Sequence, residues 1–153
     1  MNEQFSRTAL LLGEDAVERF RNARVAVFGL GGVGGYVVEA LARAGIGSLD
    51  LIDKDDISLS NLNRQILATH NTLGMPMVEA ARRRVLDINP DCRVRTFPVF
   101  YLPETADSFD FTRYDYIVDA IDTVTGKLLL AQRAAEADTP IISSMGTGNK
   151  LDP

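Results

Sequence analysis

Three glycines carry the first chemical signal in this sequence. Residues 25–34 read VAVFGLGGVG and place Gly29, Gly31 and Gly34 in the spacing G-x-G-x-x-G. Gly29 would allow a tight turn out of a strand, Gly31 would let backbone N–H groups approach a phosphate, and Gly34 would let a helix lie close to the strand. Asp53 follows about 20 residues later, where a carboxylate can accept both hydroxyls of a ribose. The pattern predicts a nucleotide site; a glycine-rich turn with a structural aspartate is the alternative.

The glycine loop alone does not separate a redox dinucleotide such as NAD from ATP. The segment 53–66, DKDDISLSNLNRQI, supplies a cation that a dehydrogenase has little need for. The Arg64 guanidinium can fork two phosphate oxygens, and Asn61 and Gln65 can hold polar atoms at the same place. Asp122 follows a predicted strand, and a carboxylate beside a triphosphate normally binds Mg²⁺. ATP with Mg²⁺ is therefore favoured over an NAD-dependent oxidoreductase, which remains an alternative.

Apolar stretches of strand length alternate with helical stripes along the chain. This order predicts parallel strands joined by right-handed crossovers, an α/β fold with a doubly wound open sheet and a ligand at the carboxyl ends of its strands. Gly45 is expected to end the first of these helices, and Asn89-Pro90 the second. The predicted strands span 24–29, 48–53, 92–99, 115–120 and 139–144, and the predicted helices span 33–44, 75–88 and 125–137.

The 153 residues are predicted to form one nucleotide-binding α/β domain at 24–153, preceded by a helical segment at 1–23. That segment has helical stripes but no strand to pair with. It is expected either to pack back on the domain or to reach a partner subunit.

Composition narrows the class of protein. The formal net charge is −5, which argues weakly against a broad nucleic-acid-binding face, and Arg82-Arg83-Arg84 is read as a solvated helix face. Cys92 is the only cysteine, so an intramolecular disulfide and a CxxC zinc site within this chain are excluded. No apolar run approaches the ~20 residues of a membrane helix, and no signal peptide is seen. We expect a cytoplasmic protein, with Cys92 as a core thiol and His70 on the surface.

Several longer motifs together resemble one family. GLGGVG, LIDKDDISLSNLNRQ, a G-x-x-x-x-E-A helix ending in DINP, and VDAID look like the ThiF/MoeB/HesA family of adenylating enzymes, which are related to ubiquitin-activating enzyme. Within that family, RTALLLGEDAVERF, DAIDTVTGK and GTGNKLDP are most similar to the tRNA threonylcarbamoyladenosine dehydratases. Those enzymes use ATP to cyclise a carbamoyl-threonyl side chain on the adenosine next to the anticodon. The resemblance implies a Rossmann-like ATP-binding fold.

The resemblance also implies roles for single residues. The loop glycines would border the nucleotide phosphates, one aspartate would hold the ribose and a second would organise the site. Polar and cationic side chains would contact the triphosphate, and an arginine near the N-terminus would cross a dimer interface to the γ-phosphate. In that order the positions are Gly29, Gly31, Gly32 and Gly34; Asp53; Asp55; Asn61, Arg64 and Gln65; and Arg7, with Asp122 binding Mg²⁺.

This sequence departs from the family pattern in two places. The family has a lysine in the motif G-x-x-K, whereas Met77 stands there in Gly74-Met75-Pro76-Met77. The phosphate charge would then be under-neutralised, and Lys127 either compensates in part or is a solvated helix residue. The family also continues for a substantial segment beyond the position of Pro153. The sequence therefore reads as the nucleotide half, with much of the acceptor half missing.

Three functions within this resemblance stay open. The first is an adenylating enzyme acting on modified tRNA. The second is an adenylyltransferase for a ubiquitin-like sulfur carrier protein of the thiamine or molybdopterin pathway. The third is a nucleotide-binding module without catalysis, which Met77 and the short C-terminus favour. By resemblance we also expect a homodimer and a cysteine desulfurase system as a partner.

Overall fold

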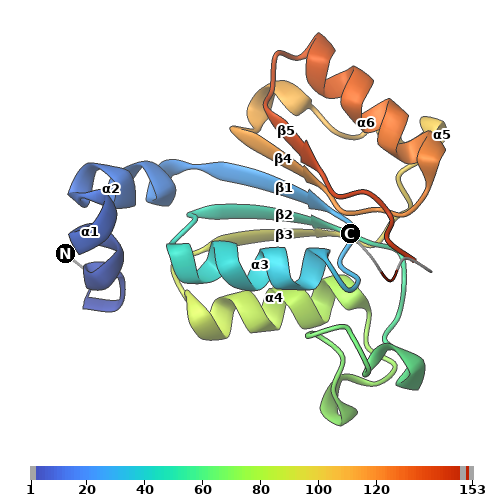
Figure 1. The fold of residues 1–153 in the computed structure, drawn as a ribbon, viewed down its shortest axis with the longest axis horizontal. Helices are drawn as coiled ribbons and strands as arrows, with labels where there is room; N and C mark the ends of the chain where they lie inside the picture. Colours follow the sequence, from blue (N-terminus) through green and yellow to red (C-terminus); the bar gives the residue numbers. More distant parts are fainter. Residues whose placement is uncertain (1–2, 149–150, 152–153) are drawn as a thin grey trace.

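A computed structural model describes residues 3–148 and residue 151; Met1, Asn2, Asn149, Lys150, Asp152 and Pro153, and with them most of the end of the motif GTGNKLDP, lie outside the described residues. The chain forms one five-stranded sheet in the order β3-β2-β1-β4-β5, with every neighbouring pair parallel (Figure 1). The strands are β1 Arg24–Phe28, β2 Ser48–Ile52, β3 Arg93–Phe97, β4 Tyr116–Asp119 and β5 Ile141–Ser143. All five predicted strands are confirmed, each shorter at one or both ends.

Helices cover both faces of the sheet (Figure 1). On one face lie α3 (Gly34–Ala44) and α4 (Met77–Ile88), and on the other lie α6 (Val124–Glu136) and the short α5 (Pro103–Ala106). The doubly wound prediction is therefore confirmed. The strand order reverses between β1 and β4, and such a switch point is where open α/β sheets bind ligands. The single-turn 3₁₀ helices η1 Glu3–Phe5, η2 Leu59–Asn61, η3 His70–Thr72 and η4 Phe111–Arg113 were not predicted.

Two apolar layers hold the sheet between the helices. On the α3–α4 side the buried core includes Val27, Leu49 and Leu51. On the α6 side Phe28 is the centre of an aromatic cluster, with its ring centroid 4.9 Å from that of Tyr101 and 5.3 Å from that of Phe109. The alternation of strand residues between these layers is what fixes the register of the sheet.

The N-terminal segment forms α1 (Ser6–Leu12) and α2 (Glu14–Asn22), beside the amino end of β1 (Figure 1). Phe5 is buried, and its Cε1 atom lies 3.0 Å from the position that a Cβ of Gly45 would take. Gly45 itself ends α3 with φ 92°, as predicted. The segment is helical, and it contacts the domain at several points: Phe5 packs against Gly45, the Gln4 side chain donates to the Ile88 carbonyl at 2.6 Å, and the Phe20 carbonyl accepts the Gly47 N–H at 2.9 Å.

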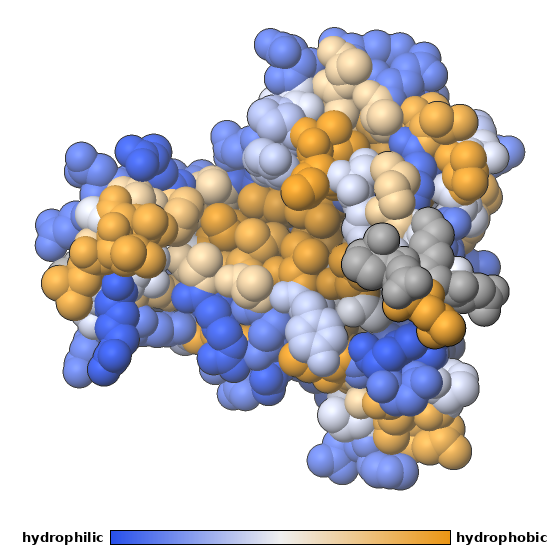
Figure 2. All heavy atoms as spheres, viewed as in Figure 1, coloured by the Kyte–Doolittle hydropathy of each residue, from blue (hydrophilic) through white to orange (hydrophobic). Residues whose placement is uncertain are grey.

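α1 keeps a strongly apolar surface. Leu10, Leu11 and Leu12 are 87%, 82% and 52% exposed. Figure 2 shows hydrophobic surface over α1 and across the middle of the same side of the molecule. Within the described residues, no helix is long and apolar enough to cross a membrane.

Candidate functional site

Residues 29–34 form the turn between β1 and α3, here called the glycine loop. Gly29 has φ +87°, and a Cβ there would lie 2.6 Å from the Ala120 carbonyl oxygen. Its N–H donates to the Ile52 carbonyl at 2.8 Å, so the loop is tied to the carboxyl end of β2. A side chain fits neither the dihedral angle nor the space, and the turn predicted at Gly29 is confirmed.

Gly34 lets the helix meet the end of the strand. A Cβ on Gly34 would stand 1.7 Å from the Gly29 carbonyl oxygen, which no real contact allows. α3 begins at this glycine, and its N-terminus has no side-chain cap. The backbone N–H groups of an uncapped first turn, with the positive end of the helix dipole, suit a phosphate.

Residues 61–65, which were predicted to contact the triphosphate, pack directly on the glycine loop. The Cβ position of Gly31 lies 3.5 Å from Gln65 Nε2, and that of Gly32 lies 3.6 Å from Arg64 Cγ. Asn61 supports the segment from within, because its Oδ1 accepts the Ser58 N–H at 2.9 Å. The structure thus brings together two groups of predicted residues that lie about 30 positions apart in the chain.

The Arg64 guanidinium is exposed and carries an unneutralised charge. Its Nη1 donates to the Ser60 carbonyl at 3.2 Å and to Asn63 Oδ1 at 2.8 Å, and no carboxylate pairs with it within the described part of the chain. A guanidinium with only neutral partners, next to a phosphate-type loop, retains its attraction for an anion.

Gln65 has a buried acceptor without a donor. Among the described residues, its Oε1 makes no hydrogen bond. Buried polar atoms are nearly always paired in folded proteins. This unpaired oxygen, on a side chain whose Nε2 borders Gly31, therefore marks a place where a ligand or a water would add a donor.

Asp53 joins the two sides of the site through its carboxylate. Oδ2 accepts the Leu30 N–H of the glycine loop at 2.8 Å, and Oδ1 accepts the Asp55 N–H at 2.8 Å. Each oxygen keeps a further acceptor position. The carboxylate thus holds the glycine loop and can still accept hydrogen bonds from a ligand.

Burial raises the pKa of the Asp53 carboxyl above its ordinary value. The N–H donors of Asp55 and Leu30 counteract this, while the charges of Asp55 and Asp122 raise the pKa further. Asp53, Asp55 and Asp122 thus form an anionic edge on the carboxylate side of the site. Ribose hydroxyls or a divalent cation are groups that such an edge would stabilise.

Asp122 lies three residues beyond the last residue of β4 and is exposed. Its charge acts on Asp53, and the backbone of the two preceding residues, Ala120 and Ile121, borders Gly29 of the glycine loop. No cluster of three or more His, Cys, Asp or Glu suited to a metal occurs in the part of the chain that the structure describes. The Mg²⁺ role of Asp122 stays a prediction, and its oxygen donors are of the kind that Mg²⁺ accepts.

Lys127 is neither a solvated side chain nor a free cation. Its amine donates to Asp119 Oδ1 at 3.1 Å and to the Ser144 carbonyl at 2.6 Å, and the side chain is 12% exposed. Asp119 is fully buried and also accepts the Ile121 N–H. The pair ties β4 to the residues after β5, and a phosphate contact by Lys127 stays a prediction that this geometry does not favour.

Arg7 lies far from the site. It is exposed on α1, beside the amino end of β1, whereas the glycine loop lies at the carboxyl end (Figure 1). Within one chain the two ends of the strand separate them. A role for Arg7 at the phosphates therefore requires a second copy of the chain.

Met77 is packed in the core at the start of α4. Its side chain is 2% exposed, and its N–H donates to the Asp55 carbonyl at 2.9 Å. The backbone of Met77 is therefore tied to residues 53–56, here called the acidic segment, but its side chain adds apolar packing rather than charge.

Other residues singled out in the sequence have ordinary surroundings. Burial raises the pKa of the Cys92 thiol to about 11, which is the core thiol predicted. His70 is exposed in η3. Arg82 and Arg83 pair with Glu79, and Arg84 with Glu39, which confirms a solvated, ion-paired helix face.

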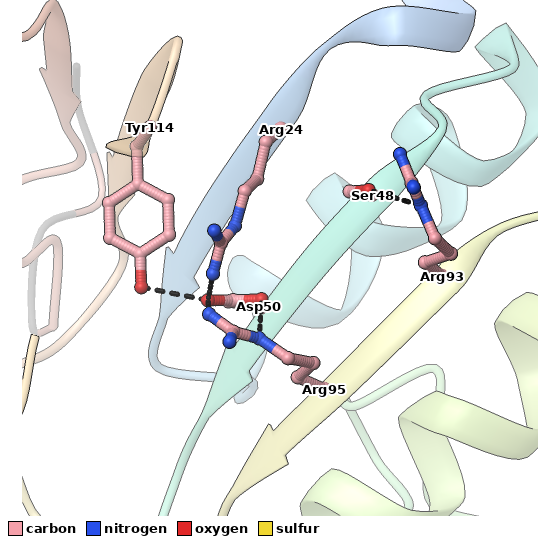
Figure 3. A network of polar contacts seen from close by, with 6 residues as sticks. All are labelled: Arg24, Ser48, Asp50, Arg93, Arg95 and Tyr114. Atoms are coloured by element: carbon pink, nitrogen blue, oxygen red, sulfur yellow. Dashed lines mark hydrogen bonds and ion pairs between the residues drawn. The ribbon is translucent and has the colours of Figure 1, made fainter. Parts of the chain in front are cut away.

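Sequence reasoning missed a second polar cluster, centred on Asp50 in the middle of β2 (Figure 3). Asp50 is 1% exposed and accepts hydrogen bonds from Arg24, Arg95 and Tyr114. The available signal was a lone acid inside the apolar strand SLDLI. Its partners come from three other segments, so only the register of the sheet could reveal them.

An open cleft of about 590 Å³ lies away from the glycine loop, between α2 and the amino ends of the strands. Its lining consists of three acids, one arginine and three uncharged residues, and it includes none of the predicted site residues. The lining residues are Asp15, Glu18, Arg19, Phe20, Asn22, Ala23 and Asp115. The candidate site is therefore defined by its chemistry rather than by the volume of a cavity.

Comparison with known proteins gives consistent matches. The profile of the ThiF family matches residues 5–150. The tRNA threonylcarbamoyladenosine dehydratase of Bacillus subtilis is 45% identical over 153 residues, which is 100% of this chain and 60% of that protein. The adenylyltransferase and sulfurtransferase UBA4 of Vanderwaltozyma polyspora is 36% identical over 86% of this chain and 30% of that protein.

Solved structures agree with these matches. The Escherichia coli tRNA N6-threonylcarbamoyladenosine dehydratase, TcdA, in complex with ATP has a TM-score of 0.94 and 39% identity, covering 99% of this chain and 62% of that one. A complex of the same protein with AMP has a TM-score of 0.93. The chain thus spans about 60% of the length of these dehydratases.

Proposed function

The chain belongs to the ThiF family, and we propose that it is the nucleotide-binding part of an ATP-dependent adenylating enzyme that acts on threonylcarbamoyladenosine in tRNA. One observation carries the proposal. The glycine loop, Asp53, Asp122 and the segment 61–65 meet at the carboxyl ends of β1, β2 and β4, in a fold that matches an ATP-bound relative over 99% of this chain.

ATP fits this arrangement group by group. The N–H groups of the glycine loop and of the first turn of α3 would bind the phosphates, with Arg64 as the cation beside them. Asp53 would accept the ribose hydroxyls through the acceptor positions left free by Leu30 and Asp55. Gln65 Oε1 is a buried acceptor in position for a donor from the ligand.

The acidic edge fits a divalent cation. The negative charges of Asp55 and Asp122 both act on the Asp53 carboxyl. Mg²⁺ held by Asp122, directly or through water, would supply charge neutralisation for the leaving pyrophosphate.

In the proposed reaction a carboxylate oxygen of the substrate attacks the α-phosphorus, and pyrophosphate leaves. A second group of the same side chain then attacks the activated acyl carbon, and AMP leaves with the oxygen, which closes the ring. The protein need supply no covalent nucleophile. Its residues align the attacking oxygen, and the loop N–H groups and Arg64 stabilise the charge that develops on the phosphates.

A sulfur carrier protein is the second candidate acceptor. The UBA4 relatives are adenylyltransferases and sulfurtransferases, at 36% identity over 86% of this chain. The dehydratases match more of the chain at higher identity, 45% over 100%, which favours tRNA. A cysteine desulfurase partner belongs with the sulfur-transfer alternative and stays a prediction, as does a cytoplasmic location.

A homodimer would complete the site. Arg7 lies beside the opposite end of β1 from the glycine loop, so it would serve the γ-phosphate of a partner copy. Leu10, Leu11 and Leu12 next to it are exposed by 52% to 87%. Burying such side chains at an interface stabilises association by about 1.5–3 kcal/mol each.

The test is ATP–pyrophosphate exchange with Mg²⁺, run with threonylcarbamoyladenosine-modified tRNA and separately with a sulfur carrier protein. Asp122→Asn is expected to lower exchange on the order of 100-fold. Asp91→Asn is the matched control, because Asp91 is exposed in the turn before β3, away from the glycine loop. ATP binding without exchange with either acceptor would favour a nucleotide-binding module, and tight NAD binding without ATP binding would refute the proposal.

Met77 gives a second arm to the test. Met77→Lys would place a cation at the start of α4, and exchange should rise by about tenfold or more if the phosphate charge is under-neutralised. The buried position is expected to make the variant less stable. Met77→Leu is the control for packing, and equal exchange in the Lys and Leu variants would show that the missing cation does not limit the reaction.

A further inference from the structure

Four arginines gather near the amino ends of the strands, on the side of the sheet that α6 covers. Arg24 comes from β1, Arg93 and Arg95 from β3, and Arg113 from η4. Figure 3 shows the first three around β2, with Arg24 and Arg95 turned toward Asp50. We call these four side chains the arginine face.

The arginine face holds more positive charge than its buried acid requires. Asp50 accepts two hydrogen bonds from Arg95, at 2.7 and 3.0 Å, one from Arg24 at 2.9 Å and one from Tyr114 at 2.8 Å. One guanidinium would balance one carboxylate. The second leaves a surplus charge, and the Arg95 side chain remains 51% exposed.

Arg93 and Arg113 add further cations to this face. Arg93 is exposed, and its hydrogen bond to Ser48 Oγ at 3.2 Å neutralises none of its charge. Arg113 is also exposed and lies close enough to act electrostatically on Asp50. Two acids lie on the Tyr114 side of the face. The charge of Arg113 acts on Asp110, and the Asp115 carboxylate accepts the backbone N–H of Arg24. The surplus is therefore largest along β3.

The arginines of α4 behave differently. Arg82, Arg83 and Arg84 are consecutive in the sequence, yet each is paired with Glu79 or Glu39. The sequence therefore displays a basic cluster that the fold neutralises, while the sheet assembles a second cluster from three separate segments and leaves it in excess.

We propose that the arginine face binds the phosphate backbone of a structured RNA, and this inference rests on the proposed function, whose acceptor is a tRNA. Guanidinium groups match phosphate oxygens in pairs. Arg93 and Arg95 lie two residues apart on one face of a strand, about 6.6 Å along it, a spacing that can serve neighbouring phosphates. The net charge of −5 repels RNA elsewhere on the chain, so contact concentrates where cations are in surplus.

The distance to the candidate site fits a large substrate. A five-residue strand is about 17 Å long, so the arginine face and the glycine loop lie roughly that far apart. A folded tRNA is longer than this. If one nucleoside of the tRNA enters the site at the carboxyl ends of the strands, the tRNA backbone on either side of it can extend over the amino half of the sheet, where the arginine face lies.

The test compares two double variants of the full chain with equal charge changes. Arg93→Gln with Arg113→Gln removes two cations of the arginine face and leaves the Arg24–Asp50–Arg95 contacts in place. Arg82→Gln with Arg83→Gln removes two paired cations from α4. Binding of an unmodified tRNA transcript is measured by fluorescence anisotropy at several salt concentrations, with thermal unfolding as the check on folding.

The arginine-face variant should bind tRNA about tenfold more weakly, and its plot of log affinity against log salt should be shallower by about 1 to 2. The α4 variant should match the unsubstituted chain within about twofold. Equal affinity and slope for the arginine-face variant and the unsubstituted chain would overturn the inference.

A parallel ATP titration separates this inference from the proposed function. An unsubstituted chain that binds ATP but no tRNA would overturn the arginine face and the tRNA acceptor together, and would leave the adenylation site standing. tRNA binding that is unchanged by loss of Arg93 and Arg113 would overturn the arginine face alone. No ATP binding, with tRNA binding that depends on these arginines, would support the face and refute the proposed function.

Discussion

Two aspartates three residues apart, Asp50 in β2 and Asp53 just after it, are both desolvated on folding but have opposite electrostatic surroundings. Burial raises the pKa of both carboxyls. Asp50 is surrounded by two guanidinium groups and a phenol. Asp53 receives only backbone N–H groups and faces two further acids. The first arrangement serves the fold, whereas the second leaves a demand that a ligand can meet.

The largest expected effect tests whether the glycine loop is needed for the stability of the fold as well as for ligand binding. Gly34→Ala should destabilise the protein by about 3 kcal/mol or more, because its Cβ would fall 1.7 Å from a backbone oxygen. Gly146→Ala is the control, since nothing lies within 4 Å of its Cβ position. Urea unfolding measures both. Equal stability of the two variants would mean that α3 can shift away from β1 without cost.

The next prediction contrasts the two aspartates directly. Asp50→Asn should cost about 2–3 kcal/mol, because it removes the buried charge that accepts hydrogen bonds from Arg24, Arg95 and Tyr114. Asp53→Asn should cost about 1 kcal/mol or less, since the amide oxygen can keep one N–H donor and the repulsion from neighbouring acids disappears. Denaturant unfolding gives the stabilities and calorimetry gives the ATP affinity, which should fall only for Asp53→Asn. The contrast fails if both variants lose the same stability and the same affinity.

Glu39 gives an intermediate case, a carboxylate paired near the surface. The guanidinium of Arg84, with help from Arg43, lowers its pKa from 4.5 to about 2. A pKa that is lower in the folded state stabilises the fold above pH 4.5 and loses that contribution as the pH falls toward 2. Because both arginines are about half exposed, Glu39→Gln should cost only about 1 kcal/mol at neutral pH. The difference in stability between the two proteins should shrink below pH 4.5, and a constant difference would contradict the prediction.

The smallest expected effect is a change in the pKa of Asp53, but not of Asp50, when ATP binds. A raised pKa means that the folded state binds the proton more tightly, so each group favours folding more as the pH falls from its folded pKa to the ordinary value of 3.8. Ribose hydroxyls donating to the Asp53 carboxylate should lower the pKa of that group. NMR titration of the side-chain carboxyl carbons, with and without ATP, should show a shift at Asp53 and none at Asp50. A shift at Asp50 alone would place the nucleotide elsewhere.

Local patterns predicted the elements because each helix and strand leaves its period in the sequence. The strands β1 to β5 fall within the predicted ranges, and the roles of Gly29 and Gly34 follow from steric demands that only glycine meets. Asp53 was found because it follows a strand end, and the segment 61–65 was found because its arginine and amide side chains suit a triphosphate.

Contacts across the sheet were not predictable in this way. Asp50 meets Arg95 because β2 pairs with β3 in a register that places these two residues side by side, and no local period encodes that pairing. Lys127 was read as a cation near phosphates or in water, but its partners Asp119 and Ser144 come from two other strands or their ends. The burial of Met77 likewise depends on how α4 packs against the sheet.

The double hydrogen bonding of Asp53 has a consequence for the speed of ligand capture. Because its carboxylate already holds Leu30 and Asp55, the loop and the acidic segment are in position before any nucleotide arrives. The loss of chain entropy is then part of folding, not of association. A nucleotide should therefore bind in a single fast step with little dependence on denaturant, and the lifetime of the complex, rather than the rate of encounter, should set its affinity.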